Sequence, residues 1–198
     1  MIYLKYVFNN ECNGNIESLS NEMAYKHYNK DSLIIKRNNN GKPYFENENN
    51  IFFNGSHSKD LICIGMSDDA IGVDAEFIKE RKFLDIASEY FYFKECKFLK
   101  SSKKLEIDFF TLWTLKEAYI KKLGKVIFDI KDSIEIDLDE RVIYNADNLF
   151  FATFILDDSY IISLCSDIKD RDVTIKTDDF NFNMIFSYPV LPQIDISI

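Results

Sequence analysis

The chain has 198 residues, 46% of them hydrophobic and 15% aromatic, which is enough apolar material for one large domain or two small lobes. Only 6 Gly and 3 Pro stand beside 18 Phe and 11 Tyr, so the composition excludes a disordered or linker-rich protein. The net charge of -9 argues against a general nucleic-acid-binding surface.

The first part of the chain is expected to be rich in strands. Apolar and alternating runs predict strands at residues 2–8, 32–37, 51–56, 61–66 and 70–77. A helix is expected over residues 16–28, with Ser18 or Ser20 as its N-cap. Asp68 and Asp69 separate the last two strands and predict a tight hairpin between them.

A helical block and a second group of strands follow. Apolar residues at helical spacing predict helices over 83–91, 94–99 and 106–122, the last closed by Gly124. Strands are expected at 133–138, 148–156, 159–166 and 172–176, with a hairpin turn at Asp157-Asp158. The apolar segment 180–198 is interrupted by prolines, and it could pack along the surface or contact a partner. This order of elements predicts an α+β protein.

The cysteines and the N-terminus bear on location. The four cysteines fit neither a zinc pattern nor a disulfide framework, so we expect each to act as a small apolar residue: Cys12, Cys63, Cys96 and Cys165. The chain begins with a predicted strand rather than a signal peptide, and no apolar run is long enough to span a membrane. The expected location is the cytoplasm.

Three acidic residues form the most informative pattern. Asp74 and Glu76 are two apart on a predicted strand, so both side chains point to one face. Glu117 lies on the long predicted helix, from which it could complete a group of three carboxylates. Such hard oxygen ligands suit Mg²⁺, which commonly also binds substrate phosphates. We therefore expect chemistry on a phosphate or diphosphate.

The long helix has two interpretations. Trp113, Glu117 and Lys121 recur every four residues and share one stripe. A Glu four residues before a Lys is also a common stabilising pair on a helix surface. The only Trp of the chain and the apolar neighbours of this stripe favour a charged pair at a buried cleft.

Two further motifs suit phosphate binding. His57 lies between Ser56 and Ser58, where imidazole and hydroxyl groups could hold a phosphate. Lys42 follows a turn glycine and precedes Pro43, which would present its ammonium group. An exposed turn histidine and a solvated lysine are the alternatives. The sequence contains no GxSxG, HExxH or GxxxxGK[ST] motif.

Together these motifs resemble the 4′-phosphopantetheinyl transferases of the Sfp type. The motifs GKPYF, FNGSHS, IGVDAE and LWTLKEAYIKKLGK occur in the same order, over residues 41–125. Members of that family move phosphopantetheine from coenzyme A to a serine of an acyl, peptidyl or aryl carrier protein and release adenosine 3′,5′-bisphosphate. The resemblance implies an enzyme of secondary metabolism or fatty-acid synthesis.

The resemblance also implies an architecture. Two similar lobes, each a helix on an antiparallel sheet, would be related by a pseudo-twofold axis with coenzyme A between them. In this chain they would be a shortened N-terminal lobe, 1–75, and a C-terminal lobe, 76–198, with the catalytic helix and a C-terminal extension. A single chain holding both lobes favours a monomer, although the C-terminal segment could form a dimer contact.

Residue roles follow from the same resemblance. Asp74, Glu76 and Glu117 would bind Mg²⁺, and Glu117 would also act as base on the carrier serine, directly or through water. Lys121 would contact the diphosphate and protonate the leaving phosphate. Coenzyme A would further be bound by Lys42, Ser56, His57 and Lys116, the last with a less defined role.

Two features depart from the family pattern and leave alternatives open. Val126 stands where relatives have a second glycine, and few residues precede Gly41. A non-catalytic relative that binds coenzyme A or a carrier protein is therefore one alternative. A Mg²⁺-dependent phosphohydrolase is another alternative, but no residue pattern in the sequence favours it.

Overall fold

The structure, a computed structural model, describes residues 1–8, 15–125, 130–131, 133–167, 173–177, 182–189 and 194–197. The helices are α1 (Ile16–Tyr28), α2 (Phe83–Tyr90), α3 (Phe93–Ser101) and α4 (Leu105–Lys122). The strands before the helical block are β1 (Ile2–Phe8), β2 (Ile35–Arg37), β3 (Pro43–Phe45), β4 (Phe52–Ser58), β5 (Leu61–Ser67) and β6 (Ile71–Phe77). The strands after it are β7 (Glu135–Asp137), β8 (Val142–Tyr144), β9 (Leu149–Leu156), β10 (Tyr160–Asp167), β11 (Val173–Thr177), β12 (Phe182–Tyr188) and β13 (Ile194–Ser197). The predicted α+β class is confirmed.

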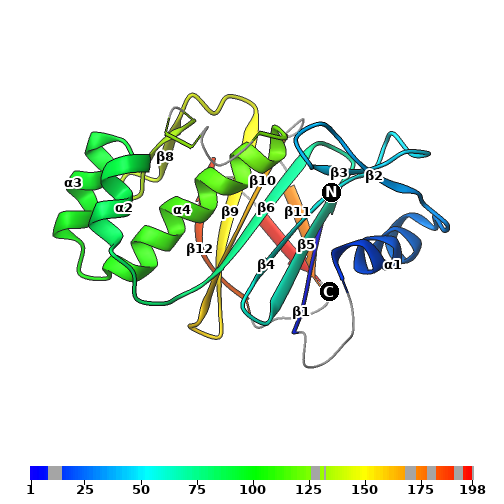
Figure 1. Ribbon diagram of the computed structural model, residues 1–198, viewed down its shortest axis with the longest axis horizontal. Helices are drawn as coiled ribbons and strands as arrows, with labels where there is room; N and C mark the ends of the chain where they lie inside the picture. Colours follow the sequence, from blue (N-terminus) through cyan, green and yellow to red (C-terminus); the bar gives the residue numbers. More distant parts are fainter. Residues whose placement is uncertain are drawn as a thin grey trace.

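Two larger sheets form the centre of the molecule (Figure 1). The first has the strand order β13-β11-β1-β5-β4 and the second has the order β12-β9-β10-β6. Strand β1 pairs in parallel with β11, so late strands of the chain join the sheet of the early ones. The expected division at residue 75 stays a prediction.

The predicted hairpin between β5 and β6 is wrong. Strand β5 pairs with β1 and β4 in the first sheet, whereas β6 pairs along its whole length with β10 in the second. The connection at Asp68-Asp69 is short, as its turn residues indicate, but it carries the chain from one sheet to the other. A local turn signal does not specify which sheet the next strand enters, since that depends on a distant partner.

Helix ends follow capping rules in one unexpected way. The N-cap of α1 is Asn15, whose side chain accepts from the Ser18 amide, while Ser18 closes the capping box. The prediction that Ser18 or Ser20 caps the helix was therefore wrong.

The hairpin predicted at Asp157-Asp158 is confirmed, and both residues adopt left-handed φ angles of 51° and 50°.

The C-terminal segment extends both sheets. Its described parts form β12, which pairs with β9, and β13, which pairs with β11. These parts are the outermost strands of the two sheets, and the contact with a partner that was left open for residues 180–198 stays a prediction.

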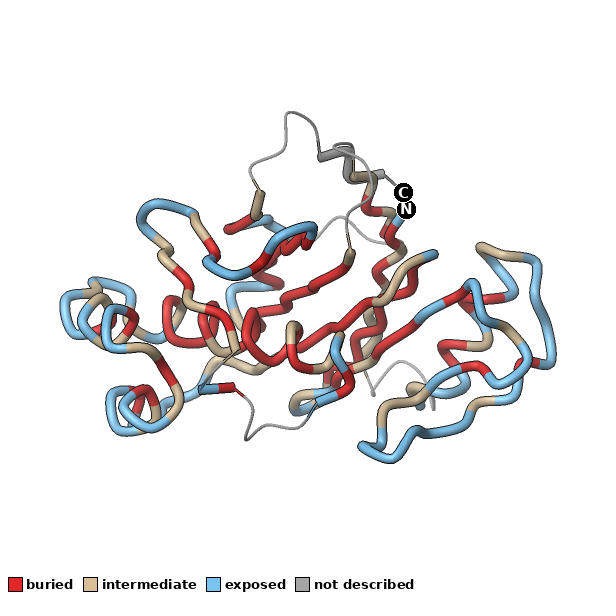
Figure 2. Tube along the Cα trace, turned by 90° about the horizontal axis from the view of Figure 1, so that it is seen from above, coloured by how far each residue is buried: buried red, intermediate tan, exposed pale blue. Residues whose placement is uncertain are grey.

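The core lies between the two sheets and beneath the helices. Figure 2 shows buried stretches along the central strands and exposed ones mainly at the two ends of the molecule. Helix α4 packs against β6 and β10, with α2 and α3 beside it, while α1 covers β5 and β4. Among the described residues, no helix combines the length and apolar character needed to cross a membrane. Cys63, Cys96 and Cys165 are free, and Cys12 lies outside the described residues.

Candidate active site

The candidate site lies where the edge strands of the two sheets meet. Strand β4 ends the first sheet and β6 ends the second. Side chains of β4 cross this seam: Asn54 Oδ1 accepts from the Val73 amide at 2.8 Å, and Ser58 Oγ accepts from the Phe77 amide at 2.9 Å. Because Asn54, Ser56 and Ser58 alternate along β4, they all face β6.

Asp74 is the centre of the site. Its Oδ1 atom accepts from Ser56 Oγ at 2.9 Å and from Lys121 Nζ at 2.6 Å, and Lys121 also donates to Ser56 at 3.1 Å. The residue is 5% exposed. Glu76, two positions along β6, is half-buried and accepts from Ser58 Oγ at 3.0 Å. The predicted pair on one strand face is present, and each carboxylate has a serine partner from β4.

Helix α4 brings Glu117 to the same place. A close approach of α4 to β6 makes this possible, since a Cβ added at Gly72 would lie 2.0 Å from the Ala118 carbonyl oxygen. Glu117 is 8% exposed. Lys121, one turn further along, directs its ammonium to Asp74 rather than to Glu117, so the charged pair expected on the helix is formed across to the strand.

Burial and the charge of Asp74 perturb the two glutamates of the group. Burial, followed by the charge of Asp74, raises the pKa of Glu117 to about 7, with Glu76 adding to the rise and Lys121 opposing it. Burial and then Asp74 also raise the pKa of Glu76. Burial lowers the pKa of Lys121, but the charge and hydrogen bond of Asp74, with the charges of Glu117 and Glu76, together outweigh it, so that pKa is raised and the ammonium stays charged. The site is an acidic group with one lysine.

This group fits a divalent cation in its chemistry. The Asp74 Oδ2 atom is buried and has no hydrogen-bond partner among the described residues. A buried carboxylate oxygen without a partner is costly, and a hard cation would satisfy it. Across the described ranges, however, no three His, Cys, Asp or Glu side chains are already grouped as metal ligands. The donor set is suitable, and its closure around an ion remains a prediction.

Two predicted site lysines have other partners. The Lys116 side chain is fully buried and pairs with Glu95 at 3.0 Å, on a different side of α4 from the acidic group. Lys42 Nζ donates to the backbone carbonyls of Lys122 at 2.7 Å and Ile71 at 3.1 Å. Burial lowers the pKa of Lys42 to about 8, with nearby Lys122 adding to the effect. Their expected contacts with coenzyme A stay predictions.

His57 stands apart from the acidic group. It is exposed, and strand alternation places it on the opposite side of β4 from Ser56 and Ser58. Nothing in the described contacts of His57 tests its expected phosphate contact. Val126 lies outside the described residues, so its effect stays untested as well.

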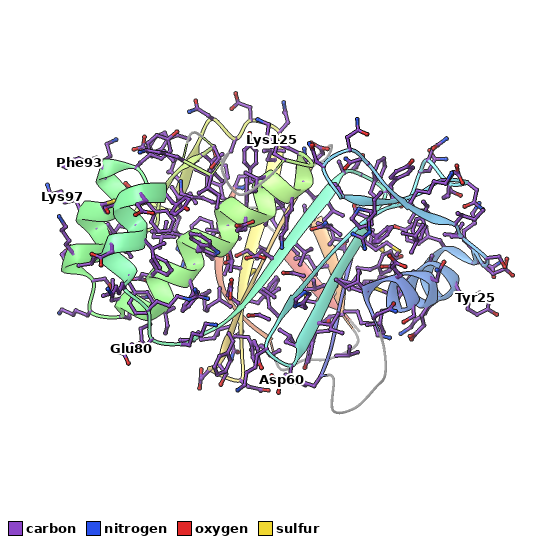
Figure 3. The ribbon with its side chains drawn as sticks, viewed as in Figure 1. Tyr25, Asp60, Glu80, Phe93, Lys97 and Lys125 are labelled. Carbon is purple, nitrogen blue, oxygen red and sulfur yellow. The ribbon has the colours of Figure 1, made fainter. Side chains whose placement is uncertain are left out.

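Several contributing residues were missed from sequence. Asn54 joins the seam, and its spacing of two from Ser56 was the available signal. Ser58 was expected only as a phosphate-binding hydroxyl, and its contact with Glu76 was missed. Arg81, which follows β6, has its guanidinium 3.9 Å from the Glu76 carboxylate. Aromatic residues of α4, including Trp113, line a small cavity of about 30 Å³ beside Glu76 and Arg81. Figure 3 labels Glu80, which follows β6, and Lys125, which follows α4.

The chain is similar to a known protein family and to several named proteins. The model of the 4′-phosphopantetheinyl transferase superfamily matches residues 70–175, which include β6 and α4. The 4′-phosphopantetheinyl transferase gsp of Aneurinibacillus migulanus is 34% identical over 118 residues, which are 58% of this chain and 48% of gsp.

Two further relatives match more of the chain. The 4′-phosphopantetheinyl transferase psf-1 of Bacillus pumilus is 32% identical over 144 residues, covering 69% of this chain and 61% of the relative. The transferase ffp of Bacillus subtilis is 32% identical over 157 residues, covering 74% and 70%. The chain thus spans about half to 70% of the length of these relatives. The match of the superfamily over more than half of the chain shows that the protein belongs to the 4′-phosphopantetheinyl transferase superfamily.

Proposed function

We propose that this protein transfers the 4′-phosphopantetheine group of coenzyme A to a serine of an acyl or peptidyl carrier protein, releasing adenosine 3′,5′-bisphosphate. The observation that carries the proposal is the contact of Lys121 with Asp74 and Ser56, beside Glu117 and Glu76, at the seam between the sheets. Three relatives named for this activity support it.

Asp74, Glu76 and Glu117 are the proposed Mg²⁺ ligands. Mg²⁺ bound there would neutralise charge on the diphosphate of coenzyme A. The unpartnered Asp74 Oδ2 atom and the raised pKa values of Glu76 and Glu117 support this set, since a cation would satisfy the oxygen and favour the charged carboxylates.

The surroundings of Glu117 and Lys121 suit each residue to one step of the transfer. A serine hydroxyl is a weak nucleophile at neutral pH and needs a base. Glu117, with a pKa of about 7, suits a general base that accepts this proton, directly or through water. Attack on the β-phosphorus breaks its bond to the bridging oxygen, and the adenosine bisphosphate leaves with that oxygen. Lys121, held in its charged form by Asp74, would stabilise this oxygen and donate a proton to it.

The proposed arrangement places coenzyme A between two lobes related by a pseudo-twofold axis. One helix on each of the two sheets, α1 on the first and α4 on the second, supports this arrangement. His57 and Ser56 are proposed to contact coenzyme A phosphates, and the cytoplasm remains the proposed location. No chemical step is assigned to Lys42 or Lys116, whose ammonium groups have protein partners, and their contacts with coenzyme A stay predictions.

Product analysis separates the proposal from its alternatives. The protein is incubated with coenzyme A and Mg²⁺, with and without an apo carrier protein, and adenosine 3′,5′-bisphosphate is quantified by chromatography. Release that requires the carrier supports a transferase. Release without a carrier would indicate a phosphohydrolase, and coenzyme A binding without release would indicate a non-catalytic relative.

A further inference from the structure

Lys42 occupies a position between the two elements that carry the acidic group. Its ammonium donates to the Ile71 carbonyl at the first residue of β6 and to the Lys122 carbonyl at the last residue of α4. Strand β6 carries Asp74 and Glu76, and α4 carries Glu117 and Lys121. One side chain from the loop between β2 and β3 therefore joins both halves of the site.

The end of α4 needs such donors. A Schellman motif satisfies two of its carbonyls, because the Gly124 amide donates to Lys121 at 3.1 Å and the Lys125 amide donates to Ile120 at 2.9 Å. The Lys122 and Gly124 carbonyls lie outside that motif. Lys42 Nζ donates to the Lys122 carbonyl, and Asn40 Nδ2 donates to the Gly124 carbonyl at 2.7 Å.

The loop fits closely over this helix end. Gly124 has a left-handed φ of 67°, and a Cβ added there would lie 3.2 Å from Asn38 Nδ2 and 3.5 Å from Lys42 Cδ. Asn38 in turn holds the loop, since its side-chain oxygen accepts from the amides of Asn40 and Lys42. The loop and the helix end are thus complementary in shape. The aliphatic part of Lys42 packs near Gly124, and its ammonium donates hydrogen bonds to two carbonyls.

We propose that Lys42 and Asn40 are positioning residues that hold the end of α4 against the start of β6 and so set the spacing of Glu117 and Lys121 from Asp74 and Glu76. This inference rests on the proposed function for its effect on catalysis. The contacts themselves belong to the protein without any ligand. An error of about 1 Å in such spacing can cost up to a hundredfold in rate.

Amide hydrogen exchange tests the contact without any need for activity. Lys42→Met keeps the aliphatic chain and removes the ammonium, and Asn40→Ala removes the neutral donor. Both variants should speed exchange at residues 70–74 and 118–125 and leave β9 unchanged. Lys103→Met, the same change at an exposed lysine before α4, is the matched control and should change neither region. Unchanged exchange at both regions in Lys42→Met would overturn the proposal.

Kinetics tests the positioning role. If the wild type modifies a carrier, Lys42→Met should lower kcat on the order of tenfold, with the Kd of coenzyme A within about twofold of wild type. Asn40→Ala should act in the same direction, and the double variant should lose less than the product of the two effects because both side chains hold the same end of α4. A rise of about tenfold or more in the Kd with kcat unchanged would instead make Lys42 a phosphate ligand and overturn the inference.

Two other outcomes are distinct. Lower stability with an unchanged kcat for the folded fraction would reduce Lys42 to a purely structural residue and also contradict the proposal. If the wild type modifies no carrier, only the proposed function is contradicted. The exchange experiment would still decide whether the contact holds α4 to β6.

Discussion

At the scale of single residues, Glu117 is kept in a place that disfavours its charge. The residue is 8% exposed and lies beside two other carboxylates, so its pKa in the folded protein is raised to about 7 from the ordinary value of 4.5. Between these two pH values the folded protein holds more protons than the unfolded chain. Its stability therefore falls as pH rises through this window.

Replacing Glu117 with Gln should remove this cost. In EDTA, the free energy of unfolding of Glu117→Gln relative to wild type should grow by roughly 3 kcal/mol between pH 4.5 and pH 7, since each pKa unit is worth about 1.4 kcal/mol. Urea denaturation across this range measures it. Asp85→Asn, at an exposed carboxylate of α2, is the control and should give a flat difference. A flat difference for Glu117→Gln would show that its charge is not disfavoured.

The candidate residues were predictable to different degrees. A spacing of two on a strand was enough to place Asp74 and Glu76 on one face, and periodicity placed Glu117 and Lys121 on one helix. The partners of Lys42 and Lys116 were not predictable, because a sequence does not say which backbone carbonyls or carboxylates a long side chain will reach in the folded chain.

At the scale of elements, a buried ion pair fastens the helical block to the strands after α4. Lys116 of α4 pairs with Glu95 of α3 at 3.0 Å, both side chains being fully buried. Glu95 also accepts from the amides of Tyr92 and Ile136 at 2.8 Å, while Lys116 donates to the Ile134 carbonyl. Burial raises the pKa of Glu95 and lowers that of Lys116, although each opposes the shift of the other.

Breaking this pair on one side should be severe. Lys116→Met leaves the Glu95 carboxylate buried without its partner and should cost about 3–5 kcal/mol of stability. Adding Glu95→Gln should restore part of the loss, because no charge is then left unpaired. Urea denaturation of the single and double variants measures both effects. A single variant as stable as wild type would mean that the pair contributes nothing to holding α3 on α4.

Gly72 sets the contact between β6 and α4. In Gly72→Ala the new Cβ would meet backbone atoms at 2.0 Å and 2.4 Å, which cannot move without shifting the helix. We expect a loss of about 1–3 kcal/mol, as for other overpacked sites. In Gly55→Ala the nearest atom belongs to the flexible Ile16 side chain at 2.7 Å, so the loss should be smaller. Equal unfolding midpoints for wild type and Gly72→Ala would contradict the tight contact.

The elements also show where sequence reasoning ends. Most strands and helices were predicted because their periodicity is local, and the Gly124 helix end was predicted because its φ of 67° favours glycine. Strand β6 was assigned to the wrong neighbour, since pairing with β10 depends on residues far along the chain. The same limit left β12 and β13 unplaced, because their partners β9 and β11 are also distant.

At the scale of the whole molecule, the site arises from the junction of two sheets. The edge strands β4 and β6 meet through side chains, and α4 lies across the second sheet with Glu117 and Lys121 at the seam. Every proposed metal ligand comes from β6 or α4, so the account requires that these two elements act together with a cation.

The measurement that tests this account most directly is the intact mass of apo carrier proteins after incubation with coenzyme A, Mg²⁺ and this protein. The wild-type protein should add the mass of one phosphopantetheine group to a carrier. That gain should be abolished by EDTA, and its rate should fall roughly a hundredfold or more in Glu117→Ala. An equal gain in Glu117→Ala, or a gain that survives EDTA, would contradict the assignment of the acidic group. No gain on any carrier, with coenzyme A still bound, would contradict the transferase itself.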